Sequence, residues 1–66
     1  MNIVYIDGPE EVRDGEVYYY AAAIDEVSGA EINCCQCNDH TSAWQAAWQL
    51  SDQCHAVEVV DNSTPY

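Results

Sequence analysis

The sequence contains no lysine, and Arg13 is its single basic residue apart from two histidines. Twelve aspartate and glutamate side chains outnumber that arginine, so the formal net charge at pH 7 is −11 in a chain of 66 residues. Proteins bind nucleic acids and anionic membranes by placing clusters of Lys and Arg against phosphates. The composition therefore excludes DNA, RNA and membranes as direct ligands, and it favours cations or strongly basic proteins as partners.

Long hydrophobic runs are absent as well. No stretch approaches the roughly 20 apolar residues of a membrane-spanning helix, and residues 1–7 lack the basic residues and the long apolar core of a secretory signal. We therefore expect a cytoplasmic protein whose cysteines are reduced thiols.

The chain nevertheless has enough apolar residues to fold. Hydrophobic residues make up 48% of it, including five Tyr and two Trp, whereas disordered chains are poor in aromatics. Its length allows one hydrophobic core. We expect a single domain over 1–66, monomeric or weakly dimeric, in which 62–66 forms a frayed tail.

Four segments have the β-branched and aromatic composition of strands. They are 3–6, 17–24, 31–37 and 56–60. Asp7-Gly8-Pro9 is a strong turn signal, so 7–16 is predicted to be a charged loop. Residues 42–53 change to a helical period, with Ser42 as one candidate N-cap and Asn38 or Asp39 as the alternative.

The element order β-β-β-α-β predicts an α+β fold. Three strands are expected to form an antiparallel meander, with the helix packed on one face of the sheet. The helix would carry the chain by a right-handed crossover to a fourth strand that lies parallel to the third.

The aromatic residues have expected places in this arrangement. Tyr18, Tyr19 and Tyr20 alternate between the two faces of a strand, and the favoured interpretation places Tyr18 and Tyr20 in the core beneath the helix. Trp44 and Trp48 lie four residues apart on the helix and are expected to flank its buried stripe.

The same topology gathers acidic residues at the two ends of the domain. One end is expected to hold Asp7, Glu10, Glu11, Asp14, Glu16, Asp39 and Asp61. A smaller group at the other end comprises Asp25, Glu26 and Asp52. Solubility alone is one explanation of such a surface, but a rigid end with seven carboxylates also approaches the charge density of duplex DNA, about one charge per ~1.7 Å.

We therefore predict an acidic inhibitor that occupies a basic nucleic-acid-binding groove and blocks DNA binding as a mimic. The predicted contact residues are Asp7, Glu10, Glu11, Asp14, Glu16, Asp25, Glu26, Asp39 and Asp61. Complementary fields would speed association, and Arg–carboxylate pairs would hold the complex.

The cysteines allow several interpretations. Buried free thiols are favoured for Cys34, Cys35, Cys37 and Cys54. A disulfide from Cys34 or Cys35 to Cys54 is one alternative, and a zinc site formed by Cys35, Cys37, His40 and Cys54 is another. Because C-C-x-C-x-x-H is not a standard ligand spacing, no metal and no cofactor are predicted.

Catalysis finds little support in the sequence. Ser42 beside His40 does not make a triad, and the adjacent Glu10 and Glu11 have nothing to raise one pKa selectively. No glycine-rich phosphate loop is present. We predict no catalytic residues and no enzymatic activity.

The small size, the absence of lysine and the acidic runs DGPEEVRDGE and IDEVSGAE give the chain an overall resemblance to phage-encoded anti-CRISPR proteins. The resemblance implies an inhibitor of a type I CRISPR–Cas system, with type I-C as a candidate subtype, acting on a Cas surveillance complex in the cytoplasm of the host bacterium. It rests on overall character, since these inhibitors share no common motif.

A second resemblance is one of pattern. The segment YYYAAAIDEVSGAEINCCQCNDHTSAWQAAWQL is similar to antitoxins of the HicB type, in which a hairpin precedes a Ser- or Thr-capped helix on a dsRNA-binding-like half-fold. The Glu- and Lys-rich helix and the separate DNA-binding segment of that family are missing. This resemblance implies, as the alternative, an antitoxin or interaction module that binds a basic partner.

Overall fold

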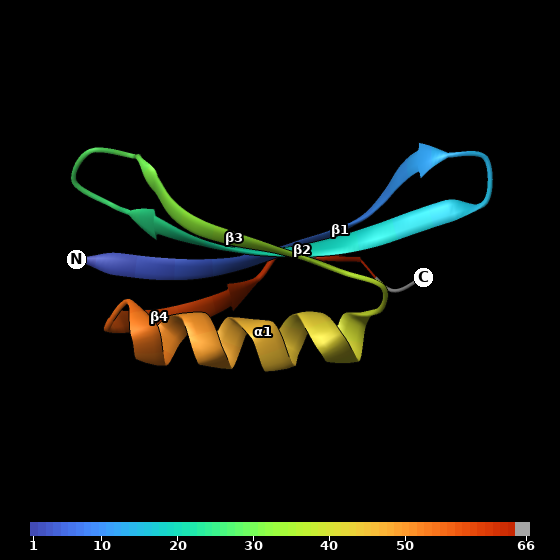
Figure 1. Cartoon of the computed structure of the whole chain (residues 1–66). Helices are drawn as coiled ribbons and strands as arrows, with labels where there is room; N and C mark the ends of the chain where they lie inside the picture. Colours follow the sequence, from blue (N-terminus) through green and yellow to red (C-terminus); the bar gives the residue numbers. More distant parts are fainter. Residues whose placement is uncertain (65–66) are drawn as a thin grey trace.

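Four strands and one helix follow one another along the chain in the predicted order (Figure 1). The computed structural model describes residues 1–64. The elements are β1 (Asn2–Arg13), β2 (Glu16–Asp25), β3 (Glu31–Cys37), α1 (His40–Gln53) and β4 (Ala56–Asp61). They form a small α+β domain in which the helix covers one face of a mixed sheet and leaves the other face open.

The strand order is β3-β2-β1-β4. The antiparallel pairing of β1 with β2 and of β2 with β3 confirms the predicted meander. The predicted neighbour of the last strand is wrong, because β4 pairs in parallel with β1 and not with β3. The helix packs over the buried centre of the sheet, which includes Val4 and Ala23. The chain that leaves its C-terminus then enters β4 at the free edge of β1.

β1 is 12 residues long and continues through the segment predicted to be a loop. The turn signal at Gly8 and Pro9 is absorbed by a register shift between Asp7 and Glu10. A bulge is one of the few places in a sheet where proline is tolerated, since it has no N–H to donate to the ladder. The charged segment is therefore an arm of a long hairpin that turns at Asp14 and Gly15.

Small residues set the spacing between the two layers. The core consists of Val4, Ile6, Tyr19, Ala21, Ala23, Cys37, Ala43, Ala47 and Leu50. Alanines from the sheet and the helix meet in this core, which lets the two layers approach closely. On the same side of β2, Tyr19 precedes Ala21 and Ala23 and extends the core toward the start of the helix.

The tyrosines occupy faces opposite to those predicted. Val4 lies beside Ala23 and Ile6 beside Ala21 in the register of β1 with β2. Side chains alternate along a strand, so this register turns Tyr19 toward the helix and Tyr18 and Tyr20 toward the open face. The physical reason is volume, because Ala21 and Ala23 leave room for Val4, Ile6 and the helix on that face, and Tyr18 or Tyr20 in the same row would not fit.

The helix begins two residues earlier than predicted. Asp39 is the N-cap, and its carboxylate accepts a hydrogen bond from the Ser42 backbone N–H at 2.7 Å. This confirms Asp39 among the alternative caps. Trp44 packs against the core as predicted, whereas Trp48 is 61% exposed and does not flank it.

The segment after β4 remains attached to the sheet. The Asn62 N–H donates to the Ile6 carbonyl at 2.8 Å, and the Thr64 N–H donates to the Gly8 carbonyl at 2.9 Å. Two of the residues predicted to belong to a frayed tail, Asn62 and Thr64, are thus hydrogen-bonded to β1 beyond the end of β4. Residues 65 and 66 of that prediction lie outside the described residues. No helix within residues 1–64 has the length and apolarity to cross a membrane.

Of the three glycines, Gly8 has the least room for a side chain. Its φ is +136°, and a Cβ there would lie 2.9 Å from Tyr19 Cδ2 and 3.0 Å from the Tyr19 Cα. We predict that Gly8→Ala destabilises the fold by about 3 kcal/mol or more, measured by urea unfolding. Gly15→Ala is the control, because φ is +79° there with nothing within 4 Å, and it should cost only about 1–2 kcal/mol. Equal losses would contradict the close contact with Tyr19.

Candidate functional site

One end of the domain carries an acidic arm. We use that name for 9–17, the part of the β1–β2 hairpin that extends past the start of α1 (Figure 1). The 12 residues of β1 reach at most about 36 Å, whereas the 14 residues of α1 reach about 20 Å. The hairpin is thus too long for the helix to cover, and the uncovered part projects.

The carboxylates of the arm are exposed. Glu10, Glu11 and Asp14 make no side-chain hydrogen bond or ion pair within residues 1–64. Glu16 accepts a hydrogen bond from the Tyr18 hydroxyl at 3.3 Å and lies 3.8 Å from Arg13. The Arg13 side chain is 77% exposed, so this ion pair is weak.

Other predicted contact residues have roles within the fold. Asp25 accepts a hydrogen bond from the Val27 N–H at 2.9 Å in the β2–β3 turn. Glu26 accepts one from the Tyr5 hydroxyl at 2.6 Å, which raises the pKa of Tyr5. Asp39 caps the helix, and the hydrogen bond from Ser42 lowers its pKa. Asp7 lies within the sheet opposite Tyr20, away from the end of the domain.

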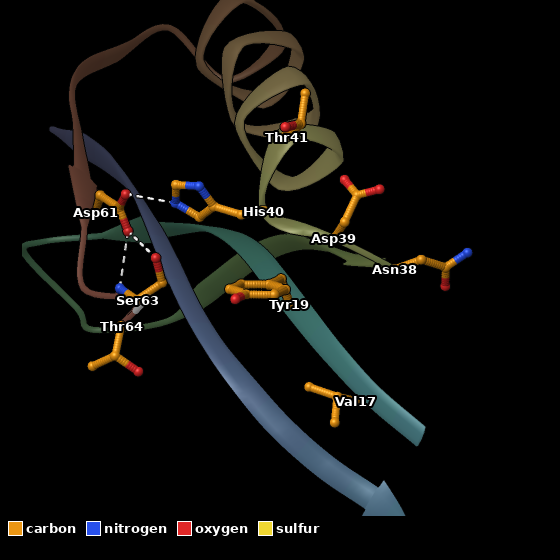
Figure 2. Close-up of a pocket in the computed structure, with 9 residues that line it drawn as sticks. All are labelled: Val17, Tyr19, Asn38, Asp39, His40, Thr41, Asp61, Ser63 and Thr64. Atoms are coloured by element: carbon orange, nitrogen blue, oxygen red, sulfur yellow. Dashed lines mark hydrogen bonds and ion pairs between the residues drawn. The ribbon is translucent and has the colours of Figure 1, made fainter. Parts of the chain in front are cut away.

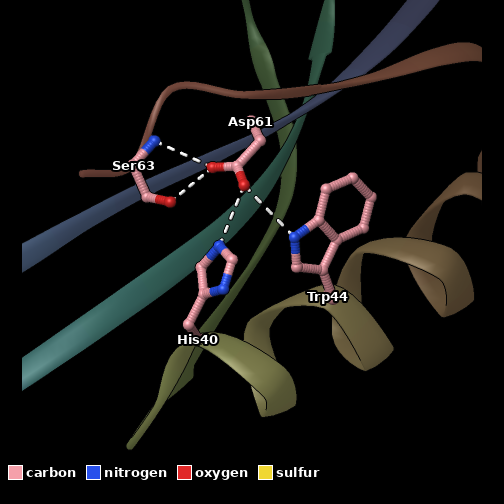
Figure 3. Close-up of polar contacts among 4 residues, drawn as sticks. All are labelled: His40, Trp44, Asp61 and Ser63. Atoms are coloured by element: carbon pink, nitrogen blue, oxygen red, sulfur yellow. Dashed lines mark hydrogen bonds and ion pairs between the residues drawn. The ribbon is translucent and has the colours of Figure 1, made fainter. Parts of the chain in front are cut away.

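Asp61 is the centre of a polar cluster that joins the end of β4 to the first turn of α1 (Figure 3). Its Oδ2 lies 2.9 Å from His40 Nε2 and accepts a hydrogen bond from Trp44 Nε1 at 3.2 Å. Its Oδ1 accepts from the Ser63 backbone N–H at 2.9 Å and from the Ser63 hydroxyl. The Ser63 hydroxyl and the His40 contact lower the pKa of Asp61 to about 2, against the effect of partial burial.

This cluster does not have the geometry of a catalytic triad. In a triad the imidazole lies between the hydroxyl and the carboxylate, whereas here the carboxylate of Asp61 lies between His40 and Ser63. A carboxylate with a pKa near 2 is also a poor proton acceptor at neutral pH. The arrangement therefore fastens the tail to the helix.

A cleft of about 620 Å³ opens between the acidic arm and the start of α1 (Figure 2). Its lining residues are Val17, Tyr19, Asn38, Asp39, His40, Thr41, Asp61, Ser63 and Thr64. Tyr19 lies at its centre, with the tail residues on one side and the β3–α1 junction on the other. The Tyr19 and His40 rings lie 5.6 Å apart, and His40 meets Trp44 edge-on at 6.4 Å.

The open face of the sheet is a second exposed surface. The register places Tyr18, Tyr20 and Ile24 of β2 on it, together with Ile3 and Tyr5 of β1, and all five are half-buried. Acidic residues surround them, including Glu58 beside Ile3 and Glu31 beside Ile24. The face is apolar at its centre and acidic at its margin.

The cysteines are free thiols. Cys35 and Cys37 share the helix side of β3, with their sulfurs 4.0 Å apart, and burial raises the pKa of Cys37 to about 11. The zinc site considered from the sequence is not assembled, because His40 turns to Asp61. In the described part of the chain no group of three or more His, Cys, Asp or Glu side chains is placed to hold a metal ion.

The predicted placement of Asp39 and Asp61 at one end of the domain agrees with their positions on the cleft, but the contacts of Asp61 with His40 and Trp44 and the cleft itself were not predicted. His40 and Asp61 are 21 residues apart, and Trp44 and Asp61 are 17 apart. Their meeting depends on the position of β4, which the sequence pattern predicted incorrectly. Neither a protein-family model, nor a curated protein, nor a solved structure matches the chain.

Asp61 should make the fold acid-sensitive. Its folded-state pKa of about 2 is below the ordinary 3.8, so the ionised carboxylate stabilises the fold above the higher value, and that stabilisation is lost as the pH falls from 3.8 to about 2. We predict that Asp61→Asn costs about 1 kcal/mol near neutral pH and reduces the loss of stability over this interval. Urea midpoints followed by Trp fluorescence measure both effects. Asp52→Asn, at an exposed helix position, is the control, and an equal response from it would contradict the assignment.

Proposed function

We propose that the protein is an acidic inhibitor that inserts its arm into a basic nucleic-acid-binding groove of a host complex and blocks DNA binding there as a mimic. The observation that carries the proposal is the arm itself. It is a projecting two-stranded ribbon with exposed carboxylates, and no lysine balances them.

The spacing of charge along the arm supports this proposal. Glu10 to Asp14 spans about 13 Å of strand, and Glu10, Glu11, Asp14 and Glu16 fall within that length. Arg13 lies in the same length, so the net charge of −3 amounts to about one charge per ~4 Å, compared with roughly 3.4 Å per phosphate of one DNA strand. Glu10 pairs with Tyr18 on the open side and Glu11 with Val17 on the cleft side, so both faces of the ribbon are charged.

The finer proposal is an anti-CRISPR protein. The overall character of the sequence supports a Cas surveillance complex of a type I system as the target, reached in the cytoplasm of the bacterial cell. The proposed action is stoichiometric binding without catalysis, by a monomer or a weak dimer. Repulsion between two chains of net charge −11 supports the monomer.

The open sheet face supports a second candidate. Tyr5, Tyr18 and Tyr20 are large amphipathic residues of the kind that dominate interface energies, and acidic residues surround them. A HicB-like antitoxin, or another interaction module, would bind a small basic protein through this face. Tyr20→Ala would then weaken binding strongly, whereas charge reversal in the arm would weaken it modestly.

Charge reversal in the arm tests the proposed function. We predict that Glu10→Lys/Glu11→Lys/Asp14→Lys abolishes the ability of the protein to displace labelled target DNA from a purified type I-C surveillance complex. The matched control is Glu31→Lys/Asp52→Lys/Glu58→Lys, at exposed positions outside the arm. Three reversals each add two positive charges, so both variants change the net charge from −11 to −5.

The control variant should displace DNA within about threefold of the wild-type protein, and displacement by the wild type should weaken steeply with salt. Both variants should unfold in urea at or above the wild-type midpoint, because each relieves repulsion. If both variants lost DNA displacement equally, net charge would explain the effect and the specific role of the arm would be contradicted. Failure of the wild type to displace DNA would refute the type I-C target, and a salt-gradient pull-down that recovers one small toxin would support the second candidate.

A further inference from the structure

The cleft beside the arm exposes the hydroxyl group of a tyrosine whose side chain is otherwise buried. Tyr19 is 5% exposed, and its hydroxyl makes no hydrogen bond within residues 1–64, although Tyr5 and Tyr18 both donate to carboxylates. No fully buried side-chain nitrogen or oxygen in that range lacks a partner. The small exposed part of Tyr19 therefore includes the hydroxyl, which faces the cleft (Figure 2).

The walls around this hydroxyl offer hydrogen-bond acceptors and negative charge. Asp39 uses its Oδ1 to cap the helix, which leaves the second carboxylate oxygen for a ligand. Thr41 and Thr64 contribute hydroxyl groups from opposite walls. Asp61 adds charge, although its four internal hydrogen bonds occupy both of its oxygens. Neither lysine nor arginine lines the cleft.

We propose that this cleft binds the guanidinium group of an arginine side chain that the basic partner supplies. The source of the arginine rests on the proposed function, whereas the chemistry of the cleft does not. A guanidinium is planar, carries five N–H donors and is weakly hydrated. It can donate to the Tyr19 hydroxyl and still has N–H groups for other acceptors of the cleft, while Asp39 on the opposite wall supplies negative charge.

The place of the cleft fits such a role. Val17 lines it and lies beside Glu11 in the β1–β2 register, so the mouth of the cleft adjoins the carboxylates of the arm. A groove that holds phosphates with arginines would meet the arm first and could extend one arginine into the cleft. The volume of about 620 Å³ is within the range of small-ligand sites and leaves room for the arginine stem and bound water.

An NMR titration of the ¹⁵N-labelled protein tests the proposal without any partner. The probes are N-acetyl-arginine amide and N-acetyl-lysine amide, which carry the same charge. The arginine probe should shift the amide signals of Asn38, Thr41, Ser63 and Thr64 along one saturable curve, and it should bind at least about threefold more tightly than the lysine probe.

Two conservative variants locate the site. Tyr19→Phe removes the hydroxyl and keeps the ring, and Asp39→Asn removes the charge and keeps a residue that caps helices as well as aspartate does. Each variant should reduce the affinity for the arginine probe by about three- to tenfold. Asp52→Asn removes the same charge far along the helix and should leave binding unchanged.

Shifts spread over the arm, unaffected by Tyr19→Phe and Asp39→Asn, would overturn the proposal in favour of diffuse counterion binding. Equal affinity for the lysine probe would overturn the guanidinium assignment. These results are separate from those for the proposed function. If the arginine probe binds specifically but charge reversal in the arm does not affect DNA displacement, the groove-blocking function alone is refuted. If charge reversal abolishes displacement but the arginine probe does not bind specifically, the cleft proposal alone is refuted.

Discussion

Val59 lies beside Val4 in the parallel pairing of β4 with β1, and most of what is distinctive in this structure depends on that pairing. It brings Asp61 over the first turn of α1, where His40 and Trp44 meet its carboxylate. It also lets the ladder continue to Thr64, which forms one wall of the cleft. Had β4 joined β3, the tail would lie at the other edge of the sheet, and neither the cluster nor the cleft would exist.

Electrostatic repulsion in so small a chain divides the acidic residues into two kinds. Asp25, Glu26, Asp39 and Asp61 accept hydrogen bonds within the fold, and these bonds offset part of the unfavourable field. The carboxylates of the arm have almost no such compensation. Selection for stability alone would disfavour their concentration on a thin projecting ribbon, because they repel one another without stabilising any contact. A basic partner would supply the missing compensation, and this is the physical argument for the proposed binding role of the arm.

Local signals predicted the elements well and their assembly poorly. The segment 31–37 is a strand with the predicted bounds, and α1 ends at Gln53 as predicted. The Gly8–Pro9 signal predicts the end of a strand, and the bulge that accommodates it within β1 depends on the partner strand. The faces of Tyr18 and Tyr20 were reversed because the choice depends on which residues fit beneath the helix. The position of β4 and the Asp61 cluster depend on contacts between distant parts of the chain, and no periodicity records them.

The arm and the cleft would contribute differently to one complex. Exposed carboxylates act over distance, so the arm would govern the association rate and its salt dependence. A guanidinium bound in the cleft would act only at contact, so it would govern the dissociation rate and the register of the bound groove. A mimic that had only the arm could slide along a basic groove, as non-specific DNA binders slide along phosphates. One arginine fixed at the base of the arm would stop that sliding, which gives a small acidic protein a way to choose one basic groove among many.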